Sequence, residues 1–134
     1  MLDLPLNIDY TGKVVVITGA GGLICSAMAR AFAQSGAKVA ALDLNEEAVM
    51  ALAEELTAEG FICKGYKANV LDPDMLATVH ESVVADLGPC DILINGAGGN
   101  NIKGIKNKNI RKMRWSWRQS RFRTLPSERR RRER

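Results

Sequence analysis

The sequence predicts an α/β domain in which helices cover both faces of a parallel β-sheet. Short apolar runs alternate with helical patterns over the first 100 residues, and the connections between them are short. The first run, Val14 to Ile17, is wholly β-branched, which is typical of a strand buried on both faces. A glycine-rich turn follows it and leads directly into a helical pattern. Strands that alternate with helices in this way form right-handed crossovers, so the sheet is expected to be parallel.

The first strand is predicted at residues 13–18. The helix that follows is expected to bury the apolar residues that recur at helical spacing, Ile24, Ala27, Met28 and Ala31. Gly36 is typical of a helix end. A second strand is predicted at residues 38–42, and Asp43 ends it.

The second helix has a clear start in the sequence. Asn45 is predicted to cap it, because the side chain can accept a hydrogen bond from the first helical turn, where Glu46 and Glu47 also favour the helix dipole. Its predicted buried face is Val49, Leu52, Ala53 and Leu56. Gly60 closes the helix.

The remaining elements complete a four-stranded sheet. Residues 61–66 form a weaker third strand, and Asp72-Pro73 predicts the capped start of a third helix. That helix is expected to bury Leu76, Val79, Val83 and Leu87. Residues 91–94 are predicted as a fourth buried strand that ends at Asn95. The expected strand order is 3-2-1-4, which places the turns after strands 1 and 4 at the switch point where ligands bind in such sheets.

The turn Thr18-Gly19-Ala20-Gly21-Gly22 joins a strand to the start of a helix. Glycines at positions 19, 21 and 22 allow a sharp turn and a close approach of the backbone to a phosphate group at the helix N-terminus. The alternative is a turn that needs glycine only for tight packing. Asp43 favours the phosphate interpretation, because a carboxylate at the end of the second strand can accept hydrogen bonds from the ribose of a dinucleotide. Its alternative is an ordinary solvated aspartate.

These motifs resemble the N-terminal half of the short-chain dehydrogenase/reductase family, which implies a Rossmann-type fold. The resemblance covers residues 8 to 101 and rests on three segments: Thr18-Gly19-Ala20-Gly21-Gly22-Leu23-Ile24-Cys25, Asn69-Val70, and Asn95-Gly96-Ala97-Gly98. Each departs from the family pattern. Leu23 and Cys25 replace glycines, Asn69 replaces an aspartate, and Gly96 replaces an asparagine. For Cys25 the preferred interpretation is a small buried side chain rather than a redox group.

The resemblance implies NAD as the cofactor, with NADP disfavoured because Asp43 would repel a 2′-phosphate. The residues expected around the pyrophosphate are Thr18, Gly19, Gly21, Gly22, Leu23 and Ile24. Asn69 and Val70 are expected to hold the adenine, and the ribose and nicotinamide side is expected to be lined by Asn95, Ala97 and Gly98. The motifs are also similar to a branch of D-mannonate or fructuronate oxidoreductases, which implies a sugar-acid substrate.

The catalytic residues that the family implies are absent from this sequence. The family uses a tyrosine with a lysine four residues later, and a serine. Here Val14 and Val70 stand four residues after Tyr10 and Tyr66, so no catalytic residue is assigned and the chain alone is not expected to catalyse the family reaction. Three separated cysteines and a single histidine predict reduced thiols and no metal site.

The charge changes sharply near residue 100, which divides the chain into a domain at 1–100 and a tail at 101–134. The first part has 5 Lys and Arg against 13 Asp and Glu, and the tail has 14 against 2. The tail is expected to be disordered, with three open explanations: a nucleic-acid-binding segment with interleaved aromatics, an unselected extension, or the product of a reading-frame slip, which is preferred. No leader or membrane-spanning run is recognised, so a cytoplasmic protein is expected. The helices through which the family pairs its subunits are not recognised either, so its oligomer interface is expected to be absent.

A competing function class follows from the same tail. In it, the domain is a nucleotide-binding scaffold without enzymatic activity, and the tail binds nucleic acid.

Overall fold

The computed structural model describes residues 7–98, so the predicted tail at 101–134 lies outside the described residues. The strands are β1 (Val14–Thr18), β2 (Lys38–Asp43), β3 (Cys63–Lys67) and β4 (Ile92–Asn95). The helices are α1 (Leu23–Gln34), α2 (Glu46–Ala58) and α3 (Pro73–Asp86). The four strands form one sheet in the order β3-β2-β1-β4, and every pair is parallel. The predicted α/β Rossmann-type fold and strand order are confirmed.

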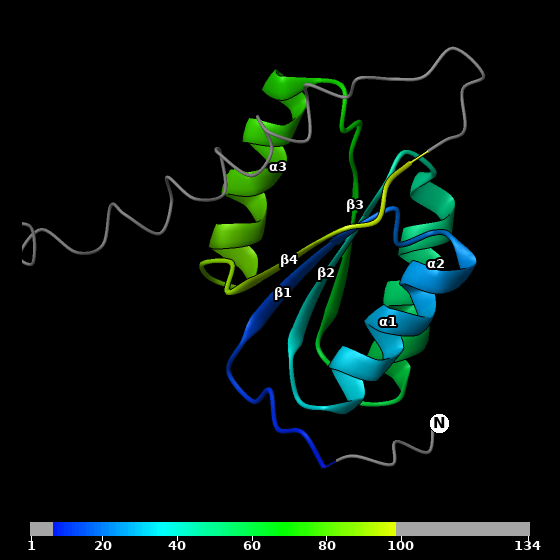
Figure 1. The fold of residues 1–134 in the computed structure, drawn as a ribbon, viewed down its shortest axis with the longest axis vertical. Helices are drawn as coiled ribbons and strands as arrows, with labels where there is room; N and C mark the ends of the chain where they lie inside the picture. The colour runs from blue at the N-terminus through cyan, green and yellow to red at the C-terminus, as the bar shows by residue number, and fades with distance from the viewer. Residues whose placement is uncertain (1–6, 99–134) are drawn as a thin grey trace, which may run out of the picture.

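Helices cover both faces of this sheet. In Figure 1, α1 and α2 lie on one side of the sheet and α3 lies on the other. Two separate groups of buried residues correspond to these faces. One includes Val15, Ile17 and Leu52, and the other includes Val16, Leu42 and Val83. Because neighbouring residues of β1 belong to opposite groups, the strand is buried on both sides, as its unbroken β-branched run predicts.

The predicted helix caps are confirmed. The Asn45 side chain accepts a hydrogen bond of 3.2 Å from the Ala48 N–H at the start of α2. The Asp72 side chain accepts two bonds of 3.1 Å, from Asp74 and Met75, at the start of α3. The predicted buried faces of α2 and α3 are also observed, since Val49, Leu52, Ala53, Leu56, Leu76, Val79, Val83 and Leu87 are all buried.

The predicted buried face of α1 is wrong. The residues that α1 buries are Cys25, Ala29 and Ala33, whereas Ile24 is 70% exposed and Met28 is 39% exposed. Small side chains let the helix lie close to the sheet, so tight packing outweighs the larger apolar area of the neighbouring residues. The expected burial of Cys25 is confirmed, and Cys63 and Cys90 are buried as well, with no disulfide among the three.

Two strand predictions also need correction. β3 begins at Cys63 and not at residue 61, and Phe61 instead packs half-buried against the core beneath α1 and α2. β4 is half-buried and not buried, because within the described sheet it pairs only with β1. The exposed side of α1 presents apolar surface at Leu23, Ile24 and Met28.

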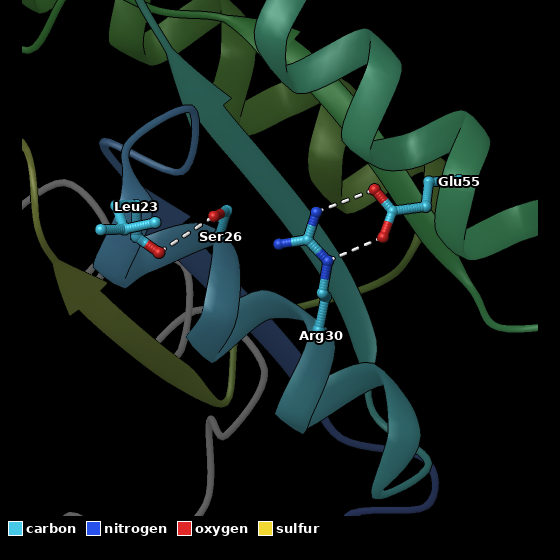
Figure 2. A network of polar contacts seen from close by, with 4 residues as sticks. All are labelled: Leu23, Ser26, Arg30 and Glu55. Atoms are coloured by element: carbon cyan, nitrogen blue, oxygen red, sulfur yellow. Dashed lines mark hydrogen bonds and ion pairs between the residues drawn. The ribbon is translucent and has the colours of Figure 1, made fainter. Parts of the chain in front are cut away.

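Helices α1 and α2 are joined by an ion pair. The Arg30 guanidinium donates two hydrogen bonds to the Glu55 carboxylate, at 2.7 and 2.8 Å, and Figure 2 shows this two-pronged contact between the helices. This arrangement raises the pKa of Arg30 and lowers that of Glu55, chiefly through the hydrogen bonds. Both side chains are partly exposed, so the pair orients the helices more than it stabilises them.

No helix in residues 7–98 combines the length and apolar character needed to cross a membrane.

His80 on α3 makes the stability of the fold dependent on pH. Burial lowers the pKa of its imidazole below the ordinary 6.5 and outweighs the opposing charge of Glu81. The unfolded chain therefore binds a proton more readily, so the stabilising contribution is present above pH 6.5 and is lost as pH falls below it. We expect the urea midpoint of unfolding to fall between pH 7.5 and pH 5.5, and to fall less in His80→Gln. An equal fall in the two proteins would contradict this assignment.

Candidate functional site

The candidate site lies along the edge of the sheet where the strands end. In the register of the sheet, Thr18 is paired with both Leu42 and Asn95, and Asp43 is paired with Lys67. The carboxyl ends of all four strands therefore meet at one edge. The glycine turn follows β1, and the other predicted segments follow β2, β3 and β4 at that same edge.

Gly19 brings the turn after β1 against the segment after β4. Its φ of +71° lies in the region that favours glycine. A Cβ at this position would stand 2.8 Å from the Ala97 nitrogen and 2.8 Å from the Gly96 carbonyl. Position 19 therefore requires glycine for tight packing, which was the alternative interpretation of the turn in the sequence.

The Asp43 carboxylate is held beside the glycine turn. One oxygen accepts a hydrogen bond of 3.0 Å from the Gly21 N–H, and the other accepts one of 2.9 Å from the Asn45 N–H. A Cβ on Gly21 would lie 3.1 Å from this carboxylate and 3.0 Å from the Ala48 side chain. Glycine at position 21 thus allows the turn and the carboxylate to approach each other, which gives Asp43 a fixed orientation.

The N-terminus of α1 differs from those of α2 and α3. Gly22 is its N-cap and provides no side-chain acceptor, and the first turn carries no acidic residue. The backbone N–H groups and the positive end of the helix dipole are therefore left for an anion. Leu23, at 89% exposure, and Ile24 lie on this first turn, where Ser26 donates a hydrogen bond of 3.1 Å to the Leu23 carbonyl (Figure 2).

Thr18 links the two central segments through its side chain. Its hydroxyl accepts hydrogen bonds from the Gly96 N–H at 3.1 Å and from the Ala97 N–H at 3.2 Å. The residue is 1% exposed. Its observed contacts therefore hold the segment after β4 in place, a role that sequence reasoning missed because nothing in the motif pairs residue 18 with residue 96.

The other predicted residues reach the same edge. After β3, Asn69 accepts a hydrogen bond of 3.0 Å on its side chain from the Leu71 N–H, and Val70 packs half-buried against the core beneath α3. The neighbouring Ala68 N–H donates to the Asp43 backbone carbonyl at 2.9 Å, so this segment begins beside the end of β2. Asn95 at the end of β4 is exposed, and so is Gly98 beyond it.

Metal ligands are not gathered in this region of residues 7–98, and the Cys63 thiol lies at the opposite end of β3. Among residues 7–98, no cluster of three or more potential metal ligands is found. Burial raises the pKa of the Cys63 thiol to about 12, which favours its protonated form. The chemistry of the edge is instead that of backbone N–H groups, a carboxylate and amides.

A parallel α/β sheet with a glycine turn, an uncapped helix and an ordered carboxylate at its switch point defines the class of dinucleotide-binding domains. The comparisons name the family. The model of the short chain dehydrogenase family matches residues 13–117, and the chain belongs to this family. The match continues past residue 101, where the sequence resemblance was expected to stop.

Relatives from several organisms share this similarity. An uncharacterized oxidoreductase from Haemophilus influenzae and the uncharacterized oxidoreductase UxuB from Bacillus subtilis are each 44% identical over 102 residues. Those residues are 76% of this chain but only 36% and 37% of the relatives. D-threitol dehydrogenase from Mycolicibacterium smegmatis is 38% identical over 98 residues, 72% of this chain and 38% of that protein.

Solved structures agree with the fold. A proposed D-mannonate oxidoreductase from Haemophilus influenzae, solved with bound NAD, is 46% identical with a TM-score of 0.69. The match covers 72% of this chain and 35% of that one. A hydroxysteroid dehydrogenase from Escherichia coli is 32% identical with a TM-score of 0.66, over 69% of this chain and 40% of that one. The chain thus spans little more than a third of the length of these relatives.

Proposed function

We propose that residues 1–100 are the NAD-binding part of an oxidoreductase that interconverts a hydroxyl group and a ketone. The observation that carries this proposal is the pairing of the Asp43 carboxylate with the glycine turn at the uncapped start of α1. A dinucleotide places its pyrophosphate at such a helix start and its ribose at such a carboxylate. When bound, the nicotinamide ring supplies or accepts the hydride.

NAD is the proposed form of the cofactor. The ribose hydroxyls of NAD can donate hydrogen bonds to the remaining lone pairs of the Asp43 carboxylate. A 2′-phosphate would bring negative charge to the same place, and the residues that follow β2 are Leu44, Asn45 and Glu46. The nearby Lys67 ammonium on β3 lies 3.8 Å from the Glu46 carboxylate, which already offsets its charge. Asn69, Val70, Asn95, Ala97 and Gly98 are proposed to line the rest of the cofactor.

A sugar acid is the proposed substrate class for the whole protein. This part of the proposal comes from the NAD-bound structural neighbour with proposed D-mannonate oxidoreductase activity, and D-threitol dehydrogenase extends it to related polyols. The chain spans little more than a third of the length of these relatives. The proposal for this chain by itself is therefore cofactor binding.

Titration of the purified chain with NADH and NADPH tests the proposal, with nicotinamide fluorescence as the readout. We expect saturable binding that favours NADH. Asp43→Ala removes the carboxylate proposed to accept hydrogen bonds from the ribose and should weaken NADH binding about tenfold, equivalent to about 1.4 kcal/mol, while NADPH binding changes less.

Asp91→Ala is the matched control, because Asp91 accepts a hydrogen bond of 3.0 Å from the Val14 N–H at the opposite edge of the sheet. It removes one carboxylate without touching the candidate site, so the NADH affinity should stay within about twofold. Circular dichroism monitors folding. A folded wild-type chain that binds neither nucleotide would refute the proposal.

A further inference from the structure

Cys25 and Gly96 lie in contact where α1 passes beneath the segment that follows β4. Both positions depart from the family pattern that the motifs resemble: Cys25 stands where the pattern has a glycine, and Gly96 stands where it has an asparagine. A Cβ built on Gly96 would overlap the Cys25 sulfur, while the Cys25 Cβ would remain 3.6 Å away. The largest conflict is therefore with the sulfur atom, and a second one is with the Thr18 carbonyl oxygen, 2.8 Å away.

The cysteine occupies this space from within the core. Cys25 is 8% exposed and belongs to the group of buried residues between the sheet and helices α1 and α2. Gly96 has no side chain to displace it. The volume that residue 96 lacks on the strand side is thus supplied by residue 25 on the helix side.

This contact bears directly on the edge of the candidate site. The Gly96 N–H donates to the Thr18 hydroxyl at 3.1 Å, and the Gly96 carbonyl lies against Gly19. A side chain at position 96 would push the segment away from Cys25 and hence away from both of those residues. The Cys25 sulfur therefore limits the approach of residue 96 from one side, while the Thr18 hydroxyl holds the Gly96 and Ala97 N–H groups from the other.

We propose that Cys25 is the positioning residue for the segment 95–98 and that the side chains at positions 25 and 96 form a size-coupled pair. Their combined volume holds the segment against Gly19, in the place where it would line the cofactor. The consequence for cofactor affinity rests on the proposed function, whereas the packing of the pair does not.

Three variants test the coupling: Gly96→Ala, Cys25→Ala, and the double variant. Gly96→Ala should lower the melting temperature and weaken NADH binding at least tenfold, because the new methyl group meets the sulfur. Cys25→Ala should weaken NADH binding only a few fold. In the double variant the sulfur is gone, so NADH affinity should recover at least threefold relative to Gly96→Ala. The recovery is partial, because the methyl group still lies 2.8 Å from the Thr18 carbonyl.

Cys90→Ala combined with Gly96→Ala is the matched control. Cys90 is also 8% exposed, but it lies just before β4 at the other edge of the sheet, so this combination should recover nothing. Affinities are measured well below the melting temperature of every variant. The proposal would be overturned if Cys90→Ala restored the NADH affinity of Gly96→Ala as well as Cys25→Ala does. It would also be overturned if the effects of Cys25→Ala and Gly96→Ala on affinity were strictly additive.

The melting temperatures separate this proposal from the proposed function. If the wild-type chain bound no NADH, the cofactor assignment would fail, and the coupling would still be measured as rescue of the melting temperature in the double variant. If NADH bound and no rescue occurred in either readout, the coupling would fail and the cofactor assignment would stand.

Discussion

Gly65→Ala is expected to destabilise the fold more than any other single methyl group added to a described glycine. A Cβ at this position in β3 would lie 2.6 Å from the Val49 carbonyl oxygen and 3.0 Å from the Met50 nitrogen. These are backbone atoms of α2, so no side-chain rotation relieves the contact and the helix itself must move off the sheet. We expect a loss of about 3 kcal/mol in the free energy of unfolding, the upper part of the range for overpacked cores.

Urea unfolding followed by circular dichroism measures this loss. Gly60→Ala is the control, since Gly60 has a φ of +89° and no atom within 4 Å of a built Cβ. It carries the penalty for a left-handed backbone, about 1 kcal/mol, without the steric conflict. A smaller loss at residue 65 than at residue 60 would show that α2 does not pack on β3 as described.

Gly19→Ala is expected to abolish the candidate cofactor site. The substitution adds the cost of a positive φ, about 1 kcal/mol, to a steric conflict with the Gly96 carbonyl and the Ala97 nitrogen. The two segments must separate, which misplaces the N–H groups proposed for the pyrophosphate. We expect NADH affinity to fall about 100-fold, equivalent to about 2.7 kcal/mol.

The control for Gly19 stands at the other end of the same strand. Gly12 has a φ of +78° and open space around a built Cβ, so Gly12→Ala carries a similar backbone penalty without the close approach. It should lower the melting temperature and leave NADH affinity within about twofold. Retention of wild-type NADH affinity in Gly19→Ala would remove the glycine turn from the proposed site.

The buried face of α1 could not be predicted from the spacing of its apolar residues. The spacing of Ile24 and Met28 predicts a buried stripe as well as the spacing of Cys25 and Ala29 does, and the larger side chains favoured the wrong face. Helix periodicity identifies the helix but leaves its rotation open when apolar residues occupy more than one side. In α2 and α3 the predicted faces are observed, although Met50 of α2 is exposed.

The candidate site divides in the same way. Local motifs located Gly19, Asp43 and Asn95, because each follows a recognisable apolar strand. No local pattern reports that the Thr18 hydroxyl bonds to residues 96 and 97, or that the Cys25 sulfur lies beneath Gly96, since these partners are more than 70 positions apart. The sequence predicted that Asp43 binds the ribose but not how its carboxylate is oriented. Hydrogen bonds from the Gly21 and Asn45 N–H groups fix that orientation.

The sequence by itself determined the α/β class, the strand order, the caps of α2 and α3 and the family, because runs, spacings and caps are properties of neighbouring residues. The rotation of α1, the half-burial of β4 and the contacts that join the glycine turn to the segment after β4 were decided only by the tertiary structure. Those features depend on how closely separate elements approach one another, and that distance is set by packing across the sheet rather than by any one segment.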